Sequence, residues 1–207
     1  MLRAAVVDNG IHGLHSFFVS SPEVHFRFES ITGDWRPDFS GDDVVIVPNG
    51  SNHVALYDAR AAIRTVLDRG AAVLCFCGCF TPWLPGTYWV HENTRPNREL
   101  DYHVVDDPMG LMLGVDPARL STESHGIRGW WACGELITAQ PQSVVLADQW
   151  KRAALVADTS STPGLIIATA SGPLGQSDPS APDDDGPRRL FRNIIRAVAR
   201  HREVQYA

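Results

Sequence analysis

Four short apolar runs predict strands in the first part of the chain, at residues 4–7, 24–28, 44–47 and 71–76. Each run stops at turn-forming residues, and the stretches between them have the apolar spacing of helices. Strands that alternate with helices in this way are typical of βαβ units and a mainly parallel sheet. Wholly apolar runs are typical of central parallel strands, which are buried on both faces.

Two helices are predicted between these strands. The first passes through Leu14, Phe17 and Phe18. The second is predicted to begin at Asp58, whose side chain can cap a helix, and to end at Gly70. Its apolar positions form one stripe, made up of Ala62, Ile63, Val66 and Leu67.

Residues 81–136 lose this regular alternation and are rich in proline and aromatic residues. We interpret them as an ordered excursion over the top of the sheet, with short helices or hairpins, because long loops in compact domains are usually functional or disordered. Four later runs are predicted to be antiparallel strands that complete the sheet, at residues 135–138, 144–147, 153–157 and 165–170.

The end of the chain is predicted to be an exposed loop followed by a helix. Residues 171–187 are rich in Gly, Pro, Ser and Asp, and residues 188–200 have helical spacing. The predicted buried stripe of this helix consists of Leu190, Ile194, Ile195 and Val198.

Composition limits the partners of the protein. The 207 residues fit a single domain over 1–207, with a formal net charge of -6. The chain lacks the basic face that nucleic acid needs and the Lys/Arg cluster that an anionic membrane attracts. The apolar start is too short for a signal peptide. We therefore expect a cytoplasmic protein that binds a small molecule, with no nucleic acid or membrane partner and with homo-oligomer formation left open.

Candidate chemistry gathers where three predicted strands end. Asp8 and Asn9 follow the first strand, residues 48–53 (PNGSNH) follow the third, and residues 75–79 (CFCGC) close the fourth. In open parallel sheets, sites form at these carboxyl ends. Cysteines two apart on a strand make a poor disulfide framework, so we read them as thiols.

These three segments, in this order and spacing, resemble the class I glutamine amidotransferase domains. VVDNGIHGLHSFF is similar to their opening strand and turn, IVPNGSNH lies where they have a Pro-Gly-Gly-type loop, and VLCFCGC lies at their nucleophile elbow. The resemblance implies an α/β, flavodoxin-like three-layer sandwich with a mainly parallel central sheet.

The resemblance also implies roles for particular residues. Cys77 would be the nucleophile, on a strained turn between a strand and a helix whose first turn holds Cys79. The backbone amides of Gly50 and Gly78 would stabilise an oxyanion. Asp8 either caps or shapes its turn, or orients or shares a proton with Cys77.

The general base is the part of the family pattern that this sequence lacks. The late loop that carries a His-x-Glu pair in the family reads ATASGPLGQSDP here, with no histidine. A thiol needs a partner to become a good nucleophile. The candidate substitutes are His53, His91, His103 and His125.

The second half of the chain resembles another branch of the superfamily, the trehalose-utilisation (ThuA-like) group. The resemblance rests on the GEL, VVLAD and GLIIATA segments, the polar loop and the terminal helix. It implies the same fold without the catalytic triad.

The sequence thus supports two functions. One is a thiol-dependent hydrolase or amide-transfer-type enzyme that uses Cys77, His53, His125 and Asp8 and needs no cofactor or metal. The alternative is a non-catalytic protein of the same fold that binds a small polar, carbohydrate-like ligand or a protein partner. A zinc enzyme is a third reading, but Cys77 and Cys79 lack the usual ligand spacing.

Overall fold

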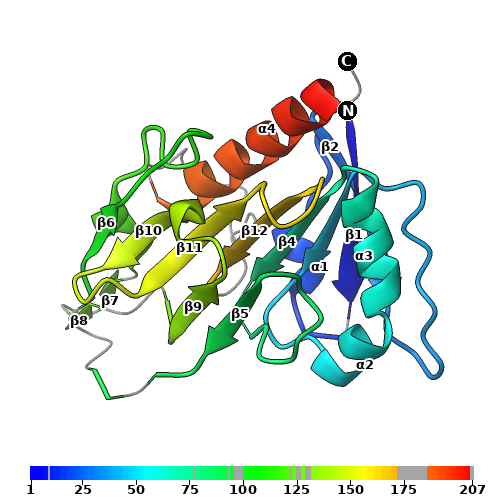
Figure 1. Cartoon of the computed structure of the whole chain (residues 1–207), viewed down its shortest axis with the longest axis horizontal. Helices are drawn as coiled ribbons and strands as arrows, with labels where there is room; N and C mark the ends of the chain where they lie inside the picture. The colour runs from blue at the N-terminus through cyan, green and yellow to red at the C-terminus, as the bar shows by residue number, and fades with distance from the viewer. Residues whose placement is uncertain are drawn as a thin grey trace.

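The computed structural model of the chain is an α/β fold built on a mixed sheet (Figure 1). It describes residues 1–8, 10–76, 78–92, 94–95, 100–121, 123–124, 127–128, 132–171 and 186–205. Within these residues the main sheet has 10 strands. Its continuous path runs β2-β1-β3-β4-β12-β11-β10-β6, and β9 pairs with β11 and with β5.

The first half of the sheet is parallel, as the apolar runs predict. β1 (Leu2–Asp8) lies between β2 (Val24–Ser30) and β3 (Val44–Val47), and β4 (Ala72–Phe76) follows on the other side of β3. Residues 4–7 and 44–47 are fully buried. These strands pack on both faces, which accounts for their lack of polar alternation.

The second half of the sheet is mainly antiparallel. Its strands are β5 (Thr87–Val90), β6 (Tyr102–Val104), β9 (Glu135–Thr138), β10 (Val144–Asp148), β11 (Ala153–Asp158) and β12 (Leu165–Thr169). β11 is antiparallel to β9, β10 and β12, as predicted. The prediction was wrong for one pairing, because β12 enters the sheet beside β4 and runs parallel to it.

The excursion after β4 contributes strands to the sheet. β6 pairs with β10 at the edge of the main sheet, and β5 pairs with β9. Short elements also lie in this region: η2 (Pro117–Leu120) and the small pair β7 (Glu123–Ser124) and β8 (Ile127–Arg128). A further short helix, η3 (Pro141–Ser143), lies between β9 and β10.

The helix before β4 begins earlier than predicted and is broken in two. α2 (His53–Asp58) is capped by the Asn52 side chain, which accepts hydrogen bonds from the amides of residues 54 and 55, both at 3.1 Å. Asp58 therefore ends α2 and does not cap a helix. α3 (Arg60–Asp68) follows, and Gly70, whose φ is 85°, comes directly after its C-cap residue Arg69.

The last helix, α4 (Pro187–Gln205), extends beyond its predicted end and buries the predicted stripe of four residues. Phe191 lies in the same helix, and its ring centroid is 6.4 Å from those of both Phe26 on β2 and Phe76 on β4. α4 thus covers the part of the sheet that contains the parallel strands. α1 (Leu14–Phe17) is a single turn.

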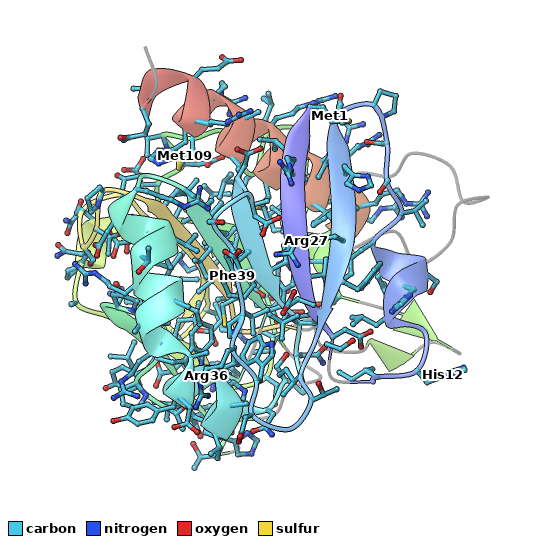
Figure 2. The ribbon with its side chains drawn as sticks, turned by 90° about the vertical axis from the view of Figure 1, so that its right-hand side faces the viewer. Met1, His12, Arg27, Arg36, Phe39 and Met109 are labelled. Atoms are coloured by element: carbon cyan, nitrogen blue, oxygen red, sulfur yellow. The ribbon has the colours of Figure 1, made fainter. Side chains whose placement is uncertain are left out.

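An ion pair fixes β2 to the segment before β3. Arg27, labelled in Figure 2, bonds both carboxylate oxygens of Asp42 and also reaches Glu29 at 2.6 Å. The Asp42 side chain is only 2% exposed. Bonding to Asp42 raises the pKa of Arg27, so the guanidinium stays charged. Among the described residues, no helix combines the length and the apolar character that crossing a membrane requires.

Candidate functional site

The candidate site lies at the carboxyl ends of the parallel strands, near the point where the strand order changes direction. β1 is flanked by β2 on one side and β3 on the other. In open α/β sheets, ligands bind in the crevice outside the carboxyl ends of the two strands at which the strand order reverses. Asp8 ends β1, and Gly50 follows β3 by three residues.

Asp8 is held at this point by two hydrogen bonds. Its Oδ2 is 2.8 Å from Nε2 of His15, and its Oδ1 accepts the amide of Gly10 at 2.8 Å. The bond with His15, and then the bond from Gly10, lower the pKa of Asp8, which is therefore ionised at neutral pH. Since an ionised carboxylate only accepts hydrogen bonds, Nε2 of His15 carries the hydrogen.

His15 is a functional candidate that the sequence reasoning missed. Its ring stacks on Phe28 of β2, with centroids 3.8 Å apart, yet its side chain is 65% exposed. With the hydrogen on Nε2, the other ring nitrogen is the basic one. Asp8 and His15 thus form an oriented carboxylate–imidazole pair. The signal in the sequence was a histidine seven residues after the strand-end aspartate, next to Leu14 of the predicted helix.

His53 occupies the first position of α2 and is almost completely buried, at 7% exposure. Its Nδ1 accepts a hydrogen bond from the Trp83 indole at 3.1 Å. An indole N–H can only donate, so the neutral ring carries its hydrogen on Nε2. Burial lowers the pKa of His53, which keeps the ring neutral.

The Nε2 atom of His53 faces the turn after β4. A Cβ atom built on Gly78 would lie 3.1 Å from it. The Phe80 ring packs against the His53 ring, with the two ring centroids 4.3 Å apart. The imidazole is therefore fixed as a hydrogen-bond donor beside Gly78. This geometry favours a donor role for His53 over the role of general base predicted for it.

Both glycines predicted to supply oxyanion donors have left-handed backbones, with φ of 74° at Gly50 and 77° at Gly78. Gly50 follows β3 and Gly78 follows β4, and their role as oxyanion donors stays a prediction. Cys77 and His125, two of the predicted catalytic residues, lie outside the described residues, as does Asn9. The predicted backbone strain at Cys77 therefore remains a prediction.

The helix predicted after Cys77 is absent. Residues 78–92 are all described, and they form turns followed by β5. Cys79 is fully buried, and its carbonyl accepts the amide of Trp89 at 2.9 Å, so its predicted place in a first helical turn was wrong. Pro82 and Pro85, so close together, prevent a regular helix here. Cys75 is buried in β4, as predicted.

The remaining candidate histidines lie elsewhere. His103 is on β6, four strands beyond β4 in the sheet order, or roughly 19 Å at ordinary strand spacing. His91 has its Nδ1 3.7 Å from the sulfur of Cys133, a thiol–imidazole contact that the sequence reasoning also missed. Within the described part of the chain, no three His, Cys, Asp or Glu side chains are grouped closely enough to hold a metal ion.

No family model matches the chain, and no curated protein matches it. Two solved structures do resemble it over nearly its whole length. Cytoplasmic protein STM3548 from Salmonella typhimurium has a TM-score of 0.58 at 9% identity, covering 95% of this chain and 98% of its own. Cytoplasmic protein STM1381 from Salmonella typhimurium LT2 has a TM-score of 0.52 at 8% identity, covering 95% and 99%. At such low identity, the similarity shows the fold alone.

Proposed function

We propose that the protein is a thiol-dependent hydrolase or amide-transfer-type enzyme whose nucleophile is Cys77. The observation that carries the proposal is the buried, neutral imidazole of His53, which presents its Nε2–H to Gly78, the residue next to Cys77. A desolvated, fixed donor at a strand end is suited to stabilising negative charge that develops during a reaction.

The proposal includes the finer description of the fold. The chain would be a single class I glutamine amidotransferase-like domain, a flavodoxin-like three-layer sandwich. The strand order β2-β1-β3-β4 supports it, because flavodoxin-like sheets begin with the same order. A cytoplasmic location is proposed with it, supported by the two structural neighbours named cytoplasmic proteins.

In the proposed reaction, a water molecule relays the proton of the Cys77 thiol to His15, because the ends of β4 and β1 are about 10 Å apart at ordinary strand spacing, and Asp8 holds the imidazole in position. The thiolate adds to the carbonyl carbon of an amide or ester. The scissile bond then breaks, and His15 returns the proton to the leaving amine or alcohol. Water, or an acceptor amine, attacks the thioester and regenerates the free thiol.

The oxyanion formed in each addition step would receive hydrogen bonds from Nε2–H of His53 and from the backbone amides of Gly50 and Gly78. One such donor contributes about 3–4 kcal/mol to transition-state stabilisation in well-studied enzymes. Across β3, the ends of β1 and β4 are about 10 Å apart at ordinary strand spacing. A small substrate over the end of β3 can therefore contact both sides of the site.

Alkylation with iodoacetamide tests this assignment. At neutral pH, Cys77 should be labelled faster than Cys75, Cys79 and Cys133, as followed by peptide mass spectrometry. His15→Ala should slow labelling of Cys77, because the thiol loses its base. His12→Ala is the matched control, since His12 is also exposed and lies beside α1. Labelling of Cys77 no faster than that of the other thiols would refute the proposal.

A non-catalytic function remains the second candidate. It is favoured by the missing helix after Cys77, because the turn lacks the helix amides that usually stabilise a thiolate. In that case the same strand ends bind a small polar, carbohydrate-like ligand or a protein partner, and Cys77 shows no enhanced labelling.

A further inference from the structure

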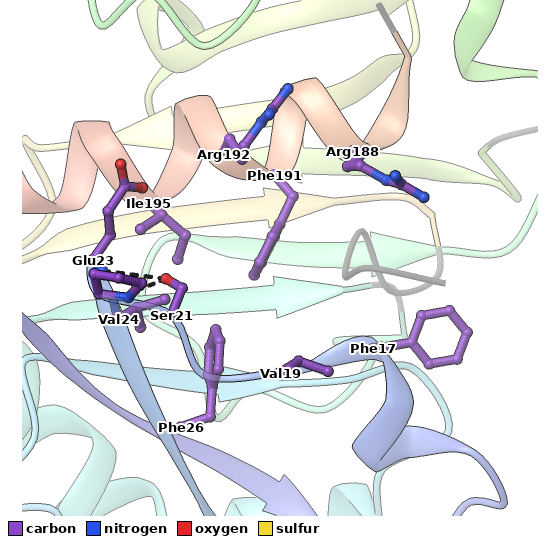
Figure 3. Close-up of a pocket in the computed structure, with 11 residues that line it drawn as sticks. Phe17, Val19, Ser21, Glu23, Val24, Phe26, Arg188, Phe191, Arg192 and Ile195 are labelled. Carbon is purple, nitrogen blue, oxygen red and sulfur yellow. Dashed lines mark hydrogen bonds between the residues drawn. The ribbon is translucent and has the colours of Figure 1, made fainter. Parts of the chain in front are cut away.

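A separate cavity lies between α4 and the edge strand β2, with a volume of about 430 Å³ (Figure 3). Pockets of ~300–1,000 Å³ with mainly apolar walls are the usual size for small ligands. Phe191 and Ile195 project into it from α4, and Val24 and Phe26 form the facing wall. The functions proposed above make no use of this cavity.

The walls of the cavity are preformed. The rings of Phe26 and Phe191 face each other at 6.4 Å between centroids, and each residue is nearly buried. The segment before β2 is fixed by its own hydrogen bonds: Ser20 Oγ accepts the amide of Phe26 at 2.9 Å, and the amide of Ser21 donates to the carbonyl of Val24 at 2.9 Å. This wall therefore presents apolar side chains to a ligand.

Charge is distributed unevenly around the cavity. Arg188 and Arg192 lie one turn apart on α4, and Glu23 lies beside Ile195 toward the other end (Figure 3). Both arginines also interact within the chain. A guanidinium group can serve several acceptors, because it has five N–H donors. A ligand with one anionic end would be oriented with that end toward the arginines and away from Glu23.

The apolar walls and the charge asymmetry define the ligand chemistry. We infer that the cavity binds a single-chain aliphatic carboxylate, with its chain packed along the Phe26–Phe191 pair and its head group at Arg188 and Arg192. Guanidinium groups bind carboxylates through paired, charge-assisted hydrogen bonds. An uncharged chain of equal length would keep the apolar contacts and lose these bonds.

Calorimetric titration with decanoate, kept below its micelle concentration, tests the inference. Decanoate should bind with one-to-one stoichiometry. The affinity of decan-1-ol should be lower than that of decanoate by about ten-fold or more. The double variant Arg188→Gln/Arg192→Gln should weaken decanoate binding by about ten-fold or more. Arg196→Gln, on the same helix but outside the cavity lining, is the matched control and should leave affinity unchanged.

A blocking variant keeps the test decisive if the arginine variants lose stability. Val19 lines the cavity and is 52% exposed, so Val19→Trp can fill the space without disturbing the core. It should weaken decanoate binding by about ten-fold or more. The inference is overturned if decanoate does not bind, or if decan-1-ol binds with the same affinity as decanoate. It is also overturned if Arg196→Gln weakens decanoate binding as much as the double variant does, or if Val19→Trp leaves decanoate binding unchanged.

Discussion

Gly78 is required for two separate reasons. Its φ of 77° is strained for any residue with a side chain, and the Nε2 atom of His53 lies 3.1 Å from the position of an added Cβ. Gly78→Ala should therefore lower the free energy of unfolding by about 2–3 kcal/mol, combining the backbone cost with displacement of the imidazole. Urea denaturation would measure the change.

The matched control for this substitution is Gly110→Ala. Gly110 has a φ of 69°, and nothing lies within 4 Å of an added Cβ. It should show only the backbone cost, about 1–2 kcal/mol. Equal losses at the two positions would contradict the close contact between Gly78 and His53.

His53 should make stability depend on pH. Burial lowers its pKa in the folded chain, whereas the ordinary value is 6.5. The unfolded chain therefore takes up a proton that the folded chain excludes. The free energy of unfolding should fall as the pH drops from about 6.5 through the folded-state pKa, and this contribution should level off below it.

Urea denaturation between about pH 5 and 8 would show this dependence. His53→Gln should reduce the slope, while His103→Gln, at an exposed position on β6, should preserve it. Burial also lowers the pKa of His201, so part of the slope should remain in His53→Gln. A slope unchanged by His53→Gln would contradict the neutral, buried state of the ring.

The sequence could place single residues at strand ends but could not find their partners. Asp8, Gly50 and His53 were identifiable because each follows an apolar run closely. Their contacts were not identifiable: His53 bonds Trp83, which lies 30 positions away. Such side-chain contacts depend on how loops fold over the sheet, which periodicity does not encode. His15 was within reach, because it follows Asp8 at the strand end by only seven residues.

At the scale of elements, the capping of α2 tests the corrected start of this helix. Asn52→Ala removes the acceptor for two amides and should lower the free energy of unfolding by about 1 kcal/mol, measured in urea. Asp58→Ala should change it by less than about 0.5 kcal/mol, because Asp58 ends α2 and lies on the surface. A larger loss in Asp58→Ala than in Asn52→Ala would support the predicted helix start at Asp58.

Elements whose signal is local were predictable. The bounds of β3 matched, β4 differed by one residue, and the buried stripe of α4 was correct. The direction of β12 relative to β4 was not predictable, because it depends on which strand becomes its neighbour. The strands β5 and β6 were hidden for the same reason, since their partners β9 and β10 come much later in the chain.

For the whole molecule, we expect no appreciable glutaminase activity. The family's late His-x-Glu pair is missing from the sequence, and the site as proposed relies on His15 and Asp8 instead. Ammonia release from glutamine, measured for the complete chain and for Cys77→Ser, checks this. Robust release that disappears in Cys77→Ser would contradict the assignment of the base.

The pairing of β4 with β12 bears on how the protein folds. β4 ends at Phe76 and β12 begins at Leu165, so the ribosome must make the whole segment between them before the two strands can pair. β1 to β4 can pair among themselves much earlier, because their connections are short. Until β12 arrives, β4 is an open, apolar edge of the growing sheet, a template for pairing with another chain. Nascent or refolding chains are therefore most vulnerable to aggregation at β4, a strand that is fully covered in the native protein.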